Sequence, residues 1–127
     1  MRIAGFILLL TTASAGCNNQ QPSEIVFPAS GISYNKTIQP LFNLSCNASG
    51  CHEAETAAGG LDLSTYYGTR YSKSGVVIPY DTINSRLIWS IEARPGAPPM
   101  PPAKSLTVNQ IQGLRKWIME GATDTIR

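Results

Sequence analysis

The stretch Cys46-Asn47-Ala48-Ser49-Gly50-Cys51-His52 decides how the rest of this sequence is interpreted. His52 is the only histidine of the chain, and it directly follows a cysteine. A second cysteine lies upstream, separated from Cys51 by four residues. A Cys-His dipeptide closely preceded by another cysteine is typical of covalent attachment of an iron-bearing cofactor. The usual spacing is two residues rather than four, so the remaining sequence has to support this prediction.

The residue types of this stretch fit haem c. The thiols of Cys46 and Cys51 can add to the two vinyl groups of haem as thioethers, and the imidazole of His52 can lie beneath the iron as its proximal ligand. A four-residue spacer must bulge, and Asn47 and Gly50 accept the left-handed backbone conformations that a bulge requires. The same residues allow an alternative, a disulfide between the two cysteines.

Length and composition bound the other possibilities. A chain of 127 residues forms one domain with a modest core. Only 14% of the residues are charged and the net charge is +2, so the basic stripe of a nucleic-acid-binding protein is not expected. With 11 Gly and 9 Pro, the chain has limited apolar surface of its own. A bound organic cofactor would supply the surface that such a small core lacks.

The first 16 residues are predicted to be a signal peptide. Arg2 is followed by a short apolar run, too short to span a bilayer, that ends in small residues. The segment Ser14-Ala15-Gly16-Cys17 resembles the lipobox of bacterial lipoproteins, in which the cysteine is acylated. Cleavage after Ala15 without lipidation and a retained anchor are the alternatives. Each of them places the domain outside the cytoplasm, facing the periplasm or on the outer membrane or cell surface.

The rest of the chain is divided into a tether and a domain. Residues 17–31 begin with a polar run and are predicted to form a flexible tether, whereas residues 32–127 form the domain. Lipidation of Cys17 would leave Cys46 and Cys51 as the remaining thiols among the three cysteines.

Apolar spacing predicts four helices in this domain. They cover 34–46, with its regular part beginning near Pro40, then 64–71, 82–92 and 108–119. Asp81 is the expected N-cap of the third helix. Ile83, Leu87, Ile88 and Ile91 are its expected buried side. Thr107 and Gln110 form a capping box for the last helix, which ends at Gly121.

Met100 is the candidate for a second axial ligand of the iron. It lies in the stiff segment Arg94–Pro102, where it is not filling the core of a helix. A thioether sulfur is a soft ligand, and His/Met ligation raises the reduction potential of haem iron. The alternatives are a proline-rich linker in which Met100 is a hydrophobic plug, and Met119 in the last helix as a rival ligand.

Three arginines are candidate partners for the haem propionates: Arg70, Arg86 and Arg94. For each of them the sequence alone favours a solvated surface charge.

Several motifs in one order resemble the class I c-type cytochromes, and more narrowly the small monohaem domains of bacterial lipoproteins and multidomain proteins. These motifs are Ile38-Gln39-Pro40-Leu41-Phe42 before Cys46, Gly59-Gly60-Leu61-Asp62-Leu63, Ser85-Arg86-Leu87, Met100-Pro101-Pro102 and Trp117-Ile118-Met119-Glu120-Gly121-Ala122. The resemblance implies an all-α, cytochrome c-like fold of three to four helices around one covalent haem c. It also implies thioethers at Cys46 and Cys51, with His52 proximal and Met100 distal. The wider spacing leaves open whether both cysteines or only Cys51 is attached.

The expected function is extracytoplasmic electron transfer rather than enzymatic catalysis, because two axial protein ligands leave no open site on the iron. Expected partners are redox proteins and a membrane, reached through the lipid on Cys17, and no nucleic acid. One alternative is a non-haem structural or interaction lipoprotein with a Cys46–Cys51 disulfide. Another is a haem sensor or peroxidase with a labile Met100. A zinc site is disfavoured, because the two thiols and His52 are crowded into adjacent positions and lack a partner elsewhere in the sequence.

Overall fold

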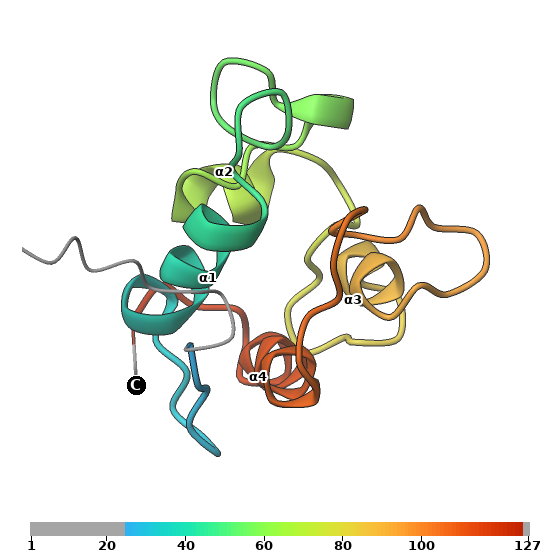
Figure 1. Ribbon diagram of the computed structural model, residues 1–127. Coiled ribbons are helices and arrows are strands. Elements are labelled where there is room, and N and C mark those ends of the chain that lie inside the picture. Colours follow the sequence, from blue (N-terminus) through green and yellow to red (C-terminus); the bar gives the residue numbers. More distant parts are fainter. Residues whose placement is uncertain (1–24, 126–127) are drawn as a thin grey trace, which may run out of the picture.

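The structure is a computed structural model that describes residues 25–125. The signal peptide, Cys17 and the beginning of the tether lie outside the described residues. Within residues 25–125 the chain forms helices and no β-strands, which confirms the predicted all-α fold (Figure 1). The elements are a π-helical turn at Tyr34–Ile38, α1 at Gln39–Ser45, a 3₁₀ turn at Ala58–Gly60, α2 at Tyr66–Tyr71, α3 at Arg86–Ile91 and α4 at Val108–Met119.

The first predicted helix is confirmed, and it has two parts. Ser33 starts the π-helical turn by accepting a hydrogen bond from the Lys36 N–H at its side-chain oxygen. The regular helix α1 begins at Gln39 and holds Pro40 in its first turn, where the missing N–H of proline costs no helical hydrogen bond. Proline therefore sets where the regular helix begins.

The third predicted helix was placed too early. It begins at Arg86 rather than at residue 82, and its N-cap is Ser85 rather than Asp81. The Oδ1 atom of Asp81 accepts the N–H groups of Ile83 and Asn84, both at 2.9 Å, and so closes a separate turn before the helix. Ile83, which we expected to be buried, is 71% exposed on this turn. An Asx turn has taken the place of the first predicted helical turn.

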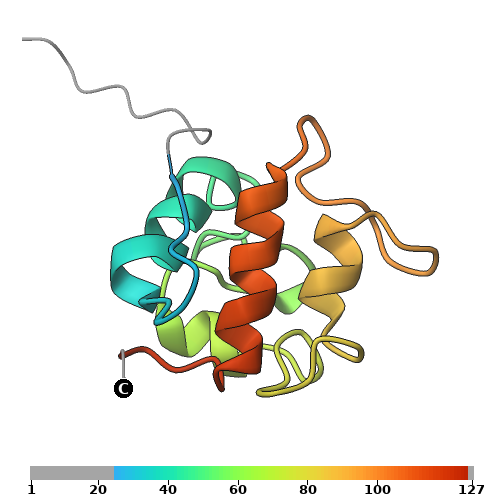
Figure 2. The same cartoon turned by 90° about the horizontal axis from the view of Figure 1, so that it is seen from below.

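The last helix has the predicted capping box. Thr107 accepts the Gln110 N–H, and the Gln110 side chain accepts the Thr107 N–H. One face of α4 buries Leu114, Trp117 and Ile118. In Figure 2, α4 runs between the π-helical turn with α1 on one side and α3 on the other.

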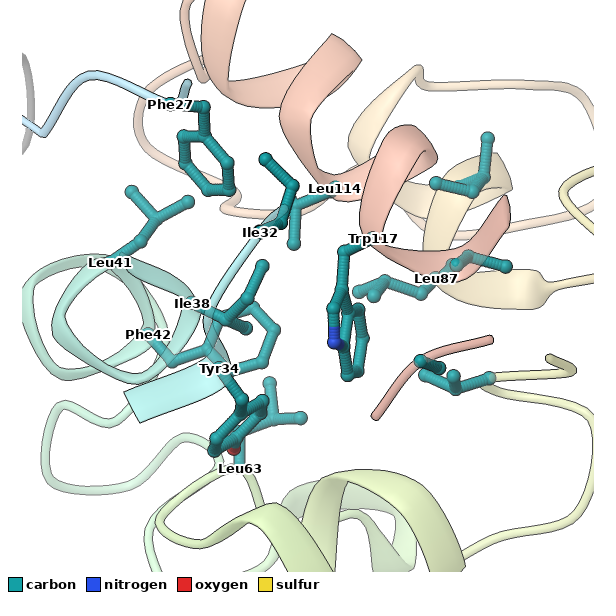
Figure 3. Packing of buried hydrophobic residues seen from close by; sticks show 14 of the residues in the cluster. Phe27, Ile32, Tyr34, Ile38, Leu41, Phe42, Leu63, Leu87, Leu114 and Trp117 are labelled. Carbon is teal, nitrogen blue, oxygen red and sulfur yellow. The ribbon is translucent and has the colours of Figure 1, made fainter. Parts of the chain in front are cut away.

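The core lies where these elements converge (Figure 3). Its centre is Tyr34, whose ring centroid lies 5.6 Å from that of Trp117 and 5.1 Å from that of Tyr66. The Tyr34 hydroxyl is hydrogen-bonded to Thr69 Oγ1 at 2.7 Å and donates to Gln39 Oε1 at 2.8 Å. Burial raises the pKa of Tyr34 to about 12. The most deeply buried apolar side chains are those of Tyr34, Ile38, Leu41, Phe42, Ile88, Leu114, Trp117 and Ile118.

The segment before the first helix packs on α4 (Figure 2). Phe27 is buried, and its N–H donates to Asn109 Oδ1 at 2.8 Å. A Cβ atom at Gly113 would lie 2.0 Å from the Phe27 ring, so only glycine allows this approach. The Glu120 carboxylate accepts the N–H groups of Gly31 and Ile32 at 3.1 and 3.0 Å. Residues 25–31, which we assigned to the tether, therefore pack with the domain.

Candidate cofactor site

A cavity of about 380 Å³ lies between the loop that follows α1, helix α3 and the loop that precedes α4. This volume is within the roughly 300–1,000 Å³ of small-molecule and cofactor sites. Cys46 and His52, from the loop that follows α1, line it together with Met100, which is distant in the sequence. Its apolar walls are formed by Phe42, Leu61, Leu63, Val76, Leu87, Ile91, Pro98, Pro101 and Leu106.

The Cys46–His52 loop is closed by hydrogen bonds between backbone groups. The Cys51 N–H donates to Ala48 O at 2.9 Å, and the His52 N–H donates to Cys46 O at 3.2 Å. Gly50 has a φ of 82°, in the left-handed region that glycine adopts without strain. The longer spacer therefore forms a compact bulge that brings His52 back beside Cys46.

The side chain of His52 is oriented by a contact with the backbone of Leu61. Its Nδ1 atom lies 3.2 Å from Leu61 O, and because a carbonyl only accepts, Nδ1 carries the proton in this contact. The backbone oxygen of His52 accepts the Leu63 N–H at 2.8 Å. In the neutral imidazole, Nε2 is then the nitrogen with a free lone pair, which is the one that can bind a metal. The Gly59–Leu63 motif thus orients the imidazole, and its two leucines form part of the cavity wall.

The two cysteines differ in their surroundings. Both are half-buried, but Cys46 lines the cavity, whereas Cys51 is not among the lining residues. Burial raises the pKa of the Cys46 thiol to about 12, and the charge of nearby Cys51 raises it further. Neither cysteine is in a disulfide within the described part of the chain. At neutral pH Cys46 is therefore a protonated thiol.

Met100 reaches the cavity from the proline-rich loop. Its backbone N–H donates to Ser90 O at 3.0 Å, which attaches the loop to α3. Met119, the rival ligand, is 55% exposed and does not line the cavity. Its place in the run of apolar residues at the end of α4 predicts a core-facing side chain, and this prediction is wrong. Met119 is the last residue of α4 and lies at the margin of the buried stripe.

The cavity has two basic lining residues, Arg86 and Lys73. Arg70 instead donates to Val77 O at 3.2 Å and lies over the ring of Tyr71. Arg94 forms an ion pair with Glu92 at 2.6 Å, and Glu92 also pairs with Arg115 at 2.7 Å. Of the three predicted arginines, only Arg86 therefore lines the cavity. Sequence reasoning missed Lys73, because no motif or periodicity marks the loop that follows α2.

No helix within residues 25–125 is long and apolar enough to cross a membrane. In the same part of the chain, no three His, Cys, Asp or Glu side chains come together as a group that would hold a metal ion.

Residues 49–104 match the model of a family described as Planctomycete cytochrome C. The match supports a cytochrome c-type domain. It includes Cys51, His52 and Met100, and it begins after Cys46. No curated protein and no solved structure matches the chain.

The residues of the cavity fit the covalently bound haem c that a cytochrome c-type domain implies. Its walls are apolar, as a porphyrin requires, and an imidazole and a thioether enter it from different loops. The hydrogen bond from Nδ1 to Leu61 O leaves the opposite ring nitrogen for the iron. Cys46 and Cys51 would hold the haem covalently, His52 and Met100 would ligate its iron, and Arg86 and Lys73 offer charge partners for its carboxylates.

Proposed function

We propose that this protein is an electron-transfer c-type cytochrome with a single haem, attached through Cys46 and Cys51 and ligated by His52 and Met100. The observation that carries the proposal is the shared cavity, which three of these four residues line. The match over residues 49–104 supports the same class of domain independently.

The haem would supply one-electron exchange at its iron. The chain's own residues bind it, orient it and exclude water. Leu61 O holds the ring of His52 in one orientation. Ser90 O holds the backbone of Met100, and the apolar walls keep the site dry. With His52 and Met100 on the iron, no coordination position remains for a substrate, which favours electron transfer over catalysis.

We further propose that the domain is carried as a lipoprotein through Cys17 on the outer side of a bacterial membrane, and that its partners are redox proteins. The lipobox-like segment supports the lipid anchor. A net charge of +2 provides little long-range steering, so docking is expected to depend on apolar contacts. Electron-transfer rates that fall steeply with added salt would contradict this mode of docking.

The test is a mass measurement on denatured protein that was exported alongside a cytochrome c maturation system. We expect a mass increment of one haem that survives denaturation, and a reduced alkaline pyridine spectrum typical of two thioether bonds. A colourless protein with Cys46 and Cys51 oxidised to each other would overturn the proposal in favour of a disulfide-containing lipoprotein. Exogenous ligands that bind readily to the ferrous form would favour a sensor or peroxidase instead.

A further inference from the structure

Glu53 directly follows His52, and its carboxylate binds back to the loop between the two cysteines. Its Oε1 atom accepts the Gly50 N–H at 2.9 Å, and its Oε2 atom accepts the Cys51 N–H at 3.0 Å. The hydroxyl of Thr56 donates to the same carboxylate at Oε1. These three donors lower the pKa of Glu53 to about 2.

These contacts lie at the C-terminal end of the loop, where the four-residue spacer leaves the position of the second cysteine least restricted by the chain itself. Backbone bonds already fix His52, through Cys46 O and the Leu63 N–H. At the start of the loop, Asn47 Nδ2 donates to Asn43 Oδ1 at 2.9 Å and to Leu63 O at 3.0 Å. At its end, Glu53 supplies the side-chain acceptor for Gly50 and Cys51 among the described contacts. The Cys51 N–H is shared between this carboxylate and Ala48 O, and the Cys51 carbonyl accepts the Ala58 N–H at 2.8 Å. Glu53 therefore adds side-chain acceptors to the backbone bonds of the residue that carries the second thiol.

We propose that Glu53 is a positioning residue for covalent attachment, which holds the four-residue loop so that Cys51 as well as Cys46 reaches its vinyl group. The proposal rests on the proposed haem-binding function. In a spacer of the usual length the short chain itself limits where the second cysteine can lie, whereas a four-residue spacer allows more conformations that separate the cysteines. The carboxylate of Glu53 removes part of that freedom.

The attachment step itself is redox-neutral. The sulfur–hydrogen bond of the thiol breaks, a sulfur–carbon bond forms to one vinyl carbon, and the hydrogen goes to the other vinyl carbon as the double bond becomes single. Glu53 takes no part in this bond exchange, so its effect is on the fraction of Cys51 that reacts. Cys46, which is fixed by α1, should react in either case.

The experiment compares the wild-type protein with Glu53→Gln and with the matched control Glu55→Gln, each produced with a cytochrome c maturation system. Glu55 is exposed two residues further on, and the described part of the chain gives its side chain no hydrogen bond. Haem-containing protein is denatured, alkylated with iodoacetamide and digested, and alkylated Cys51 is quantified by mass spectrometry. We expect about a three- to tenfold larger alkylated fraction in Glu53→Gln, because a weaker neutral acceptor replaces the carboxylate. Glu55→Gln should match the wild type.

Thr56→Val provides a second, milder variant, because it removes one donor and keeps the carboxylate in place. It should increase the alkylated fraction of Cys51 by a smaller factor than Glu53→Gln does. It also keeps the test decisive if the Glu53→Gln protein accumulates poorly. Equal Cys51 alkylation in all proteins would overturn the inference, as would parallel loss of attachment at both cysteines, which is the signature of a general folding defect. Wild-type protein that contains haem but has Cys51 unattached would overturn it too. A wild-type protein without haem would instead defeat the proposed function itself.

Discussion

The two sides of this small domain are held together in different ways. On one side, which we call the packed half, Tyr34, Phe42, Trp117 and their neighbours fill the space between α1, α2 and α4 (Figure 3). On the other, the cavity half, the Cys46–Leu63 loop, α3 and the Met100 loop surround a space of about 380 Å³. Contacts between buried side chains stabilise the packed half, whereas hydrogen bonds to backbone groups hold much of the cavity half.

This difference shows how a chain of 127 residues can build a deep cofactor site. The packed half provides a rigid frame, and the cavity half leaves its apolar walls to be covered by the bound group. A ligand that binds only the folded state adds its binding free energy to stability. The cavity half should therefore depend on haem, and the packed half on its own side chains.

The largest effect is expected from Trp117→Ala, which breaks the packed half. The side chain is 1% exposed, contacts Tyr34 and donates from its ring nitrogen to Thr123 O. Its loss should lower the free energy of unfolding by about 3–5 kcal/mol. Denaturant unfolding followed by circular dichroism measures this. Trp89→Ala is the control, because Trp89 is only half-buried. An equal loss in both variants would mean that the packing of Trp117 against Tyr34 contributes no more to stability than that of a half-buried tryptophan.

Met100→Ala tests the cavity half without removing core volume. Loss of a thioether ligand should lower the reduction potential by roughly 0.1 V or more, because His/Met ligation favours ferrous iron. A redox titration monitored by absorbance measures the shift. Met119→Ala should leave the potential nearly unchanged, since Met119 is 55% exposed outside the cavity. The reverse pattern would assign the ligand to Met119.

Tyr34→Phe sharpens the comparison within the packed half, because it keeps the ring and removes the hydroxyl. We expect a loss of about 1–2 kcal/mol at neutral pH, as Thr69 and Gln39 each lose a partner. The raised pKa of Tyr34, about 12, makes its contribution complete below about pH 10 and lost as the pH rises toward 12.

The corresponding measurement is stability against pH. The decline of stability between pH 10 and 12 should be smaller in Tyr34→Phe than in the wild type. Tyr67→Phe is the control, because Tyr67 is 73% exposed. A decline that Tyr34→Phe leaves unchanged would show that other groups cause the alkaline sensitivity.

The smallest effect is expected from Arg86→Gln at the wall of the cavity. A positive charge near haem favours the reduced iron, so its removal should lower the potential by roughly a few tens of mV. Arg94→Gln removes the same charge from a residue that is paired with Glu92 and does not line the cavity. Equal shifts in the two variants would indicate a general charge effect rather than a specific role of Arg86.

The helices and much of the site were predictable, because strong local patterns encode them. Pro40 and the Thr107–Gln110 capping box mark helix starts, and the Cys46–His52 and Met100 motifs indicate residues that share a cavity. The start of α3 was not predictable from the sequence. An aspartate is equally favoured as the N-cap of a helix and as the first residue of a turn, and here Asp81 closes a turn.

The remaining misses depend on contacts between distant parts of the chain. The docking of Phe27 on Gly113 joins residues that no local pattern relates. The same holds for the hydrogen bonds that the N–H groups of Gly31 and Ile32 donate to the Glu120 carboxylate. Met119 shares the helical spacing of buried residues and yet lies at the margin of the stripe, where spacing alone does not decide exposure. Tertiary contacts decide these cases.

The Met100 loop is attached to the domain by fewer hydrogen bonds than the loop that carries His52. The proximal side is tied down by backbone bonds at Cys46, Cys51, His52 and Leu63, so His52 can leave only if several of these break together. Among the contacts of residues 25–125, the backbone of Met100 is held by one hydrogen bond, to Ser90 O. Local fluctuations draw on the least-connected segments of a fold. The two faces of the cofactor should thus exchange with solvent on different timescales, and small molecules that reach the iron would arrive from the methionine side while the rest of the domain stays folded.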